Sequence, residues 1–315
     1  MAARFGSGAL RYELVEGWER LPAGWVHDDV AGVACDNQGR VYLYARGEHP
    51  VIVYDRDGTF LGSWGEGRFS YRTHGMYFGR DGHLYLVDDL GSSVGRYSVE
   101  GELLQWYGPQ GTTSDAAPYN RPTNAGLAPS GQVYVSDGYG NTRVHRFSGD
   151  GELLQSWGEP GSGPGQFRTP HGIWAHDDGR VFVADRQNER LQIFDAGGGF
   201  LGAWTDVQRP QDLFVDAAGL TYVVELSWHA GEVSHKTGPV AEYVPGRLSI
   251  LDPEGNPVLR WSVADLSRPD AILAPHGVWV DDEGSIYIAH VTNTVLGHRG
   301  AVPPGALTFQ KFARV

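Results

Sequence analysis

The chain has 315 residues, 41% of them hydrophobic, and a formal net charge of −13 at pH 7. This charge argues against nucleic acid and against an anionic membrane surface as partners, because both attract basic patches. A single cysteine, Cys35, excludes an internal disulfide, and neither a signal peptide nor a membrane-spanning run is visible, so we expect a cytoplasmic protein.

A repeated unit of short apolar strands and glycine turns runs through the chain. In its clearest copy, residues 173–175 and 181–184 are apolar, residues 177–179 form a hairpin turn, and further strands are expected at 191–195 and 200–204. Aligning the turn glycine recovers the unit at Gly39, Gly82, Gly131, Gly179, Gly219 and Gly284. Intervals of about 40 to 50 residues, with one longer last interval, are typical of propeller blades. We therefore predict an all-β fold, a single six-bladed β-propeller domain over residues 1–315.

The blades follow one another along the chain, and both termini are expected to share the last one. Residues 11–18 resemble the fourth strands elsewhere but precede the first complete unit, so we expect them to form the outer strand of blade six, beside a strand at 307–312. Blade five carries a long insertion at about 226–246, and blade six a second one near 291–305. A third long connection, 109–122, leads into blade three. Connections of this length are often functional.

The residues that open the first strand of each blade form an alternating pattern. Eight positions before each turn glycine stand Ala31, His74, Thr123, His171, Gln211 and His276. Histidine therefore opens blades two, four and six only. Since first strands are innermost, the three imidazoles are expected about 120° apart around the axis, on the same face as the long connections.

Three converging neutral histidines predict a metal site with an open fourth position, which is the arrangement of catalytic zinc. Zn²⁺ is the metal that we expect, although iron, cobalt or manganese also accept three nitrogen ligands. We favour a protein that binds a small molecule through this metal over a propeller that only binds other proteins. Protein binding does not require histidine on alternate blades.

Several residues on the same face are candidates for the remaining chemistry. Tyr139 and Arg46 follow the second strands of blades three and one, and a phenol beside a metal ion and an arginine is a suitable general base. Arg46 is alternatively a clamp for a substrate carboxylate. Arg186 is a second clamp candidate, or it forms an inter-blade ion pair of the kind that Asp185 suggests.

The insertion of blade five offers two further substrate-binding candidates, Trp228 and His229. His229 and the nearby His235 are either additional metal ligands or acids, or ordinary loop histidines.

The repeats resemble NHL repeats, and the constellation resembles the peptidyl-α-hydroxyglycine α-amidating lyase family. The matching segments are Ala45-Arg46-Gly47, Thr73-His74-Gly75, residues 135–143, Pro170-His171 with 184–188, and Pro275-His276 with 292–295. The resemblance implies a zinc propeller in which His74, His171 and His276 bind the metal, Tyr139 is the base, and Arg46 assists it or orients the substrate. It also implies cleavage of an N–C–OH centre to an amide and an aldehyde.

The sequence departs from this family at two positions near the last histidine. Ala274 stands where the family has methionine, and Gly277 where it has a carboxylate that binds a structural calcium, so calcium is not expected. We interpret the chain as a metal-dependent lyase with a small substrate. The alternatives are a metal-dependent hydrolase or hydratase at the same site, and a non-enzymatic NHL scaffold.

Overall fold

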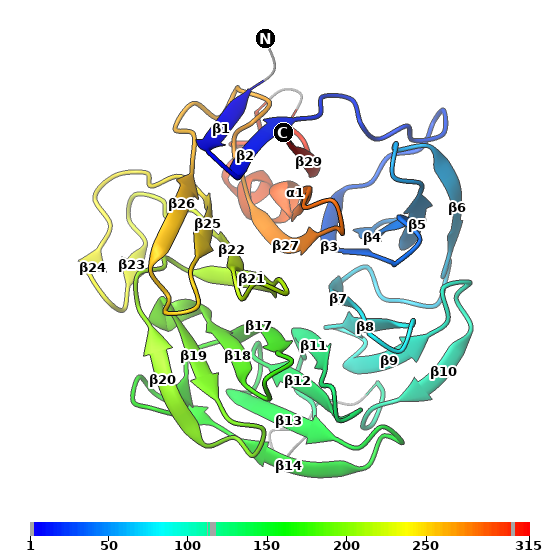
Figure 1. Cartoon of the computed structure of the whole chain (residues 1–315), viewed down its shortest axis with the longest axis vertical. Coiled ribbons are helices and arrows are strands. Elements are labelled where there is room, and N and C mark those ends of the chain that lie inside the picture. Colours follow the sequence, from blue (N-terminus) through cyan, green and yellow to red (C-terminus); the bar gives the residue numbers. More distant parts are fainter. Residues whose placement is uncertain (1–2, 112, 114–117, 304–305) are drawn as a thin grey trace.

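The computed structural model of the chain describes residues 3–111, 113, 118–303 and 306–315. Within these ranges, six antiparallel sheets stand around a central axis as the blades of a propeller (Figure 1). The predicted all-β six-bladed fold is thereby confirmed. Residues 112 and 114–117 of the connection 109–122, and residues 304–305 of the blade-six insertion, lie outside the described residues.

Each of the first five blades contains four strands. Blade one consists of β3 (Asp29–Cys35), β4 (Val41–Arg46), β5 (Val51–Tyr54) and β6 (Phe60–Trp64). Blade two consists of β7 (Thr73–Phe78), β8 (Leu84–Asp88), β9 (Ser93–Tyr97) and β10 (Leu103–Trp106). Blade three consists of β11 (Asn124–Leu127), β12 (Val133–Asp137), β13 (Arg143–Phe147) and β14 (Leu153–Trp157). Blade four consists of β17 (Pro170–Ala175), β18 (Val181–Asp185), β19 (Arg190–Phe194) and β20 (Phe200–Trp204). Blade five consists of β21 (Pro210–Val215), β22 (Thr221–Glu225), β25 (Arg247–Leu251) and β26 (Pro257–Trp261).

Blade six joins the two ends of the chain. Its strands from the axis outward are β27 (Pro275–Val280), β28 (Ile286–His290), β29 (Phe309–Arg314), β2 (Leu10–Leu14) and β1 (Arg4–Ser7). Strand β2 pairs antiparallel with β29, as predicted for an N-terminal closing strand, but it ends at Leu14 rather than at residue 18. The sequence analysis missed β1, which adds a fifth strand outside β2. Pairing across the termini leaves no free edge on β29.

Tryptophans at the ends of fourth strands hold neighbouring blades together. Trp64 of blade one lies against Gly101 in the outer hairpin of blade two, and Trp157 of blade three lies against Gly198 of blade four. A Cβ atom at Gly101 would stand 2.6 Å from the indole of Trp64, and Gly101 also has φ +89°, so only glycine fits there. This repeated contact accounts for part of the high glycine and tryptophan content.

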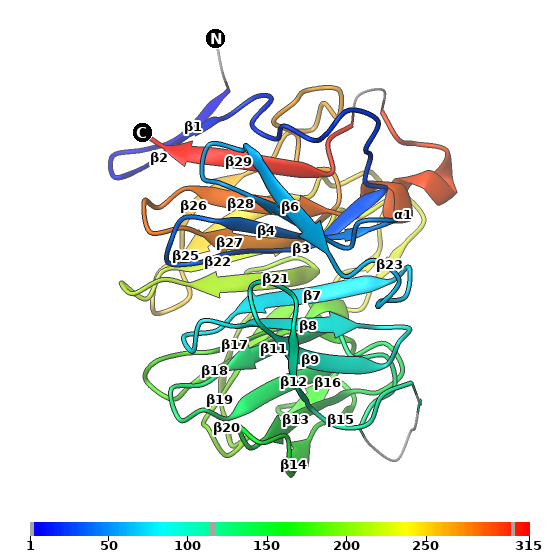
Figure 2. The ribbon, with the colours of Figure 1, turned by 90° about the vertical axis from the view of Figure 1, so that its right-hand side faces the viewer.

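The insertions and short elements gather at one side of the ring. They are β15 (Glu159–Pro160), β16 (Gln166–Phe167), η1 (Arg186–Asn188), β23 (Val233–Ser234), β24 (Gly238–Pro239), α1 (Thr292–Leu296) and η2 (Gly297–Arg299). Figure 2 shows β23 and α1 at the same side of the disc, as expected from strand direction. No helix in the described ranges has the length and apolar character needed to cross a bilayer.

Candidate metal centre

The three histidines that open first strands meet on the axis. His74, His171 and His276 are buried, and one ligand nitrogen from each lies within 4.8 Å of the others. Each histidine stands where the pairing of its strand with the next is irregular, between Thr73 and Met76 in β7, between Pro170 and Ile173 in β17, and between Pro275 and Gly277 in β27. Such bulges re-aim a side chain, here toward the channel axis.

The glycine after each histidine brings the next blade close. A Cβ atom at Gly75 would stand 2.6 Å from the carbonyl oxygen of Thr123, and one at Gly172 would stand 2.8 Å from that of Gln211. This close approach lets the imidazole of one blade reach the backbone of the next. The sequence therefore needs a His-Gly pair at these positions, and not histidine alone.

Every imidazole is oriented by a backbone carbonyl of the following blade. The Nδ1 atoms of His74, His171 and His276 lie 2.5, 2.7 and 2.7 Å from the carbonyl oxygens of Thr123, Gln211 and Ala31. A carbonyl oxygen only accepts hydrogen bonds, so Nδ1 must carry the proton and Nε2 must present a lone pair in the neutral ring. Blades one, three and five thus supply the acceptors at the repeat position where blades two, four and six supply histidines.

The site keeps its histidines neutral. Burial, followed by the charges of the neighbouring histidines, lowers the pKa of His74 well below its ordinary value. Burial and Arg186 have the same effect on the pKa of His171, and burial lowers the pKa of His276 to about 3. Neutral imidazole is the form that binds metal ions.

These donors fit a tetrahedral metal ion. The Nε2 atoms of His276 and His74 lie 3.2 Å apart, whereas two nitrogens bound to zinc at about 2.0 to 2.1 Å are expected about 3.3 to 3.4 Å apart. Three lone pairs converge here, and the nearby phenol of Tyr139 has one proton to offer them. A cation satisfies all three nitrogens at once, which a single hydroxyl proton does not.

Tyr139 lies at the open side of the histidine cluster. Its hydroxyl oxygen is 3.0 Å from His74 Nε2 and 3.2 Å from His171 Nε2. Two glycines bring the loop after β12 to this place, because a Cβ at Gly138 would stand 1.9 Å from the Pro170 carbonyl oxygen and one at Gly140 2.1 Å from the Asn120 side chain. The phenol is thus within hydrogen-bonding distance of two of the three imidazoles.

Three guanidinium groups surround the ring of Tyr139. Those of Arg72, Arg121 and Arg186 lie 5.8, 5.1 and 5.3 Å from its centroid. Asp89 forms ion pairs with Arg72 and Arg121, at 2.7 and 3.4 Å. Arg186 forms no ion pair with any described residue: Nη1 donates to the Tyr139 oxygen at 3.4 Å, and its buried Nε has no partner there. Nη1 also lies 3.5 Å from Gln211 Oε1, so the guanidinium has polar contacts but no carboxylate partner among the described residues.

Asp185 forms its ion pair with another arginine, and within blade four rather than between blades. Asp185 pairs with Arg190 of the third strand at 2.8 Å and accepts a hydrogen bond from the backbone of Arg168.

Arg46 is buried, and its Nη1 donates to Thr294 Oγ1 at 2.6 Å and lies 3.4 Å from Asp29. Burial lowers the pKa of Arg46. The Tyr139 oxygen thus accepts a hydrogen bond from Arg186. Arg46 instead donates hydrogen bonds to Thr294 and Asp29.

Trp228 and His229 lie in the blade-five insertion, which runs between Glu225 and Arg247 as predicted. The indole of Trp228 is buried beneath the guanidinium of Arg209, at 4.3 Å. The imidazole of His229 packs against Tyr243 of the same insertion, with 5.1 Å between ring centroids. Neither His229 nor His235 belongs to the histidine cluster among the described residues.

Comparison with known proteins places this architecture in a family. A model of the NHL repeat matches residues 167–194, most of blade four. NHL repeat-containing protein 3 from Homo sapiens is 32% identical over 304 residues, which cover 90% of this chain and 82% of that protein. The chain belongs to the NHL-repeat family.

Other relatives carry the names of amidating enzymes. Peptidylglycine alpha-amidating monooxygenase from Rattus norvegicus is 31% identical over 334 residues, covering 88% of this chain but 32% of that larger protein. The probable peptidyl-alpha-hydroxyglycine alpha-amidating lyase pgal-1 from Caenorhabditis elegans is 29% identical over 47% of this chain and 43% of that protein. A streptogramin B lyase structure shares the fold, with a TM-score of 0.60 at 13% identity over 96% of this chain and 85% of that chain.

The sequence analysis missed the arginines that precede the first strands of this NHL propeller. Arg72, Arg121 and Arg209 each stand two residues before a strand-opening position. Arg121 and Arg209 adopt positive φ angles of 64° and 33°, a strained conformation that is common at functional sites. Alignment of the repeats at that position would have found them.

Proposed function

We propose that the protein is a zinc-dependent carbon–nitrogen lyase that cleaves an N–C–OH centre in a small substrate carrying a carboxylate. The observation that carries this proposal is the phenol oxygen of Tyr139, 3.0 and 3.2 Å from two of three converging imidazole nitrogens. The amidating relatives support the same reaction type. The inward-facing, neutral histidines favour an enzyme over a scaffold that binds proteins on its rim.

The residues around the site have distinct roles in this reaction. A zinc ion held by His74, His171 and His276 supplies a Lewis acid that makes a substrate hydroxyl more acidic. Tyr139, in its phenolate form, accepts the hydroxyl proton. The electron pair of the O–H bond becomes the second bond of a C=O group while the C–N bond breaks, and the departing nitrogen takes a proton back from Tyr139. The products are an amide and an aldehyde.

Arg186 serves two purposes in the proposed reaction. Its Nη1 donates to the Tyr139 oxygen, which offsets the negative charge of the phenolate. Its guanidinium forms no ion pair with any described residue, and it would therefore hold a substrate carboxylate. A carboxylate next to the carbinol carbon would lie between Arg186 and the histidines, as an α-hydroxyglycine requires.

Turnover of N-benzoyl-α-hydroxyglycine by the zinc-loaded protein tests the proposal. We expect benzamide and glyoxylate as products, and Tyr139→Phe to lower kcat by about 10²- to 10⁴-fold while zinc remains bound, because the proton acceptor is lost and the ligands are intact. Tyr134→Phe is the matched control in the same blade. Its hydroxyl donates to the Ala196 carbonyl at 2.8 Å, away from the site, so its turnover should match that of the unmodified protein.

Product analysis in ¹⁸O-water separates the lyase from a hydrolase at the same metal. A lyase yields benzamide without ¹⁸O, whereas hydrolysis of the amide bond yields benzoate with one ¹⁸O atom. Benzoate as the main product, or full activity of Tyr139→Phe, would overturn the lyase assignment.

A further inference from the structure

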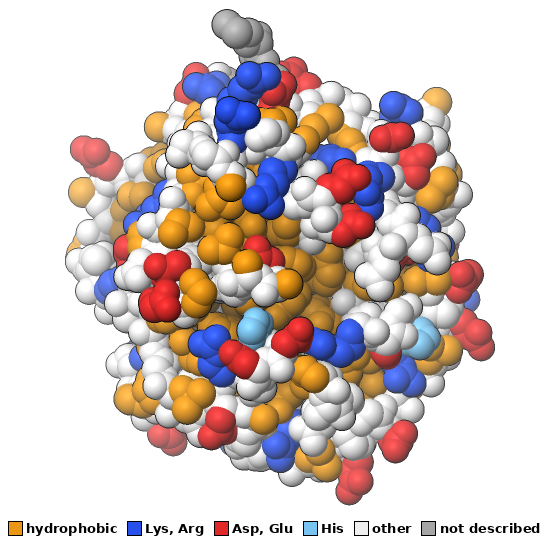
Figure 3. All heavy atoms as spheres, in the orientation of Figure 1, with side chains coloured by type: hydrophobic (Ala, Val, Ile, Leu, Met, Phe, Trp, Pro, Cys, Tyr) orange, Lys and Arg blue, Asp and Glu red, His pale blue; other side chains and the backbone are white. Residues whose placement is uncertain are grey.

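A cavity opens on the face opposite the histidines. It has a volume of about 500 Å³, within the range of small-molecule sites, and lies where hairpin turns join the first two strands of five of the six blades. Figure 3 shows this face, with a hydrophobic hollow at its centre and acidic side chains around it. The proposed lyase reaction makes no use of this cavity.

Aromatic rings from four blades form the floor of the cavity. Tyr77, Trp174, Phe214 and Trp279 occupy the same repeat position, three residues after the strand-opening residue, while Ala34 and Gly126 hold it in blades one and three. Neighbouring rings pack at centroid distances of 5.3 Å for Tyr77 and Trp174, 4.8 Å for Trp174 and Phe214, and 5.1 Å for Phe214 and Trp279. Tyr77 and Trp279 close the ring at 5.7 Å.

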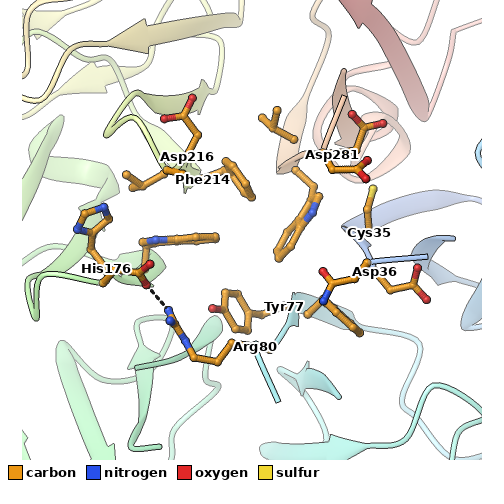
Figure 4. A pocket seen from close by; sticks show the side chains of 18 residues that line it. Cys35, Asp36, Tyr77, Arg80, His176, Phe214, Asp216 and Asp281 are labelled. Carbon is orange, nitrogen blue, oxygen red and sulfur yellow. Dashed lines mark hydrogen bonds and ion pairs between the residues drawn. The ribbon is translucent and has the colours of Figure 1, made fainter. Parts of the chain in front are cut away.

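The rim of the cavity is acidic. Asp36, Asp177, Asp216, Asp281 and Asp282 all belong to the lining. Figure 4 shows Asp36, Asp216 and Asp281 around the cavity, with Tyr77 and Phe214 between them.

Two of these carboxylates form no ion pair in the described part of the chain, although Asp281 also interacts with the more distant charges of Lys311 and Arg56. Asp216 and Asp281 accept hydrogen bonds from turn amides and from tyrosine hydroxyls, and neither forms an ion pair with any described residue. Arg80 is the one lysine or arginine in the described lining, and Asp177 holds it at 2.6 Å. The lining therefore offers π faces and negative charge together, without a free positive group.

We propose that this cavity binds a small organic cation with an alkylated ammonium group. Aromatic faces attract such cations while accommodating their methyl groups, and nearby carboxylates add long-range attraction. An anion would meet uncompensated aspartates, and a neutral apolar ligand would gain nothing from them. The floor of rings lies between this cavity and the histidines, so the two sites bind independently.

Choline, with its neutral isostere 3,3-dimethylbutan-1-ol, is a suitable pair of probes for the full-length protein. We expect saturable choline binding by titration calorimetry, at least about tenfold tighter than that of the isostere, because the two differ in charge and hardly in shape. The methyl protons of choline should shift upfield in the NMR spectrum on binding, since they would lie over aromatic rings. Absence of saturable choline binding, or equal affinity for the isostere, would overturn the proposal.

Matched variants locate the binding to this cavity. Phe214→Leu and Trp279→Leu should each weaken choline binding at least about fivefold by removing a π face, and Asp216→Asn should weaken it by removing charge while its Oδ1 still accepts the turn amides. Tyr71→Leu removes an exposed aromatic ring outside the cavity and should leave binding unchanged. The double variant His74→Ala/His171→Ala should bind choline normally, so a failed lyase assignment leaves this test intact. Unchanged affinity in all three cavity variants would place binding elsewhere and contradict the proposal.

Discussion

The orientation of each metal-site histidine depends on the residue one blade away. His74 and His171 donate through Nδ1 to the carbonyl groups of Thr123 and Gln211, which stand at the same repeat position as the histidines themselves. The side chains of Thr123 and Gln211 are not needed for this contact. The alternation of histidine with other residues therefore divides the blades into those that supply imidazoles and those that supply the carbonyl acceptors.

A buried carboxylate lies one residue beyond this ring of carbonyls. Asp212 follows Gln211 in β21 and occupies a position that is glycine after each of the three histidines. Its Oδ1 accepts a hydrogen bond from Asn124 Nδ2 at 2.9 Å, and its Oδ2 accepts one from the Val278 amide at 3.3 Å. Burial outweighs these hydrogen bonds and raises the pKa of Asp212 to about 7.

The raised pKa of Asp212 predicts a specific pH dependence of stability. The folded protein holds a proton on Asp212 up to about pH 7, whereas the unfolded chain releases it near pH 4, so this group lowers the free energy of unfolding as pH rises through that window, by up to about 4 kcal/mol. Asp212→Asn removes the effect. The free energy of unfolding of the variant, minus that of the unmodified protein, should rise between about pH 4 and pH 7 and then stay level.

Urea denaturation of both proteins across this pH range measures that difference, in which the other titrating groups cancel. A difference that does not change with pH would contradict the assignment of a raised pKa to Asp212.

At the scale of the elements, polar side chains in the middle of the blade-five insertion attach it to its neighbours. Ser234 of β23 donates a hydrogen bond to the buried carboxylate of Glu189 in blade four. Glu232 forms ion pairs with Arg209 at 3.2 Å and with Arg299 of the blade-six insertion at 2.9 Å. These contacts hold the insertion in place on the histidine face.

Ser234→Ala tests this attachment. The change leaves a carboxylate oxygen of Glu189 buried without its donor, so we expect a loss of about 1 to 3 kcal/mol in the free energy of unfolding. Thr237→Ala, at an exposed position of the same insertion, should change it by less than about 0.5 kcal/mol. Chemical denaturation measures both, and equal values for the two variants would show that the Ser234 contact does not stabilise the insertion.

The repeat pattern predicted the elements well because the blades have apolar strand residues and turn glycines at equivalent positions. Gly39 and its five counterparts mark hairpin turns, and all six have positive φ. Their spacing along the chain predicted the positions of the strands and of the insertion at 226–246. The direction of the strands then predicted the face on which the histidines lie. Strand β1 was missed because the repeat gives no reason for a fifth strand. An ion pair of Asp185 with its neighbour Arg186 was one of two alternatives from the sequence, but Arg190 reaches Asp185 across the sheet from β19. Sequence proximity does not decide such pairs.

The convergence of the three histidines could be predicted from the sequence, but the residues around them could not. The spacing of the histidines follows the period of the repeat, whereas the convergence of Arg72 and Arg121 on Tyr139 depends on Asp89, which holds both from a loop of blade two. The aromatic position of Tyr77 and Trp174 is periodic too, and the repeat alignment contained that signal. The pKa values depend on burial, which only the folded chain shows.

At the scale of the whole molecule, the two faces of the propeller differ in their chemistry. The histidine face gathers arginines around Tyr139, although the chain as a whole carries a net charge of −13. The opposite face places aspartates around an aromatic floor. This polarity fits an anionic substrate at the metal and a cation at the opposite face.

The most direct test of the metal centre is the metal content of protein purified without added metal, measured by mass spectrometry. We expect about one zinc ion per chain in the unmodified protein and in His176→Ala, whose imidazole lines the opposite cavity, and none in His74→Ala/His171→Ala, because one remaining imidazole does not hold the ion. No bound metal in the unmodified protein, even after reconstitution with zinc, would contradict the account and leave a propeller whose histidines serve another purpose.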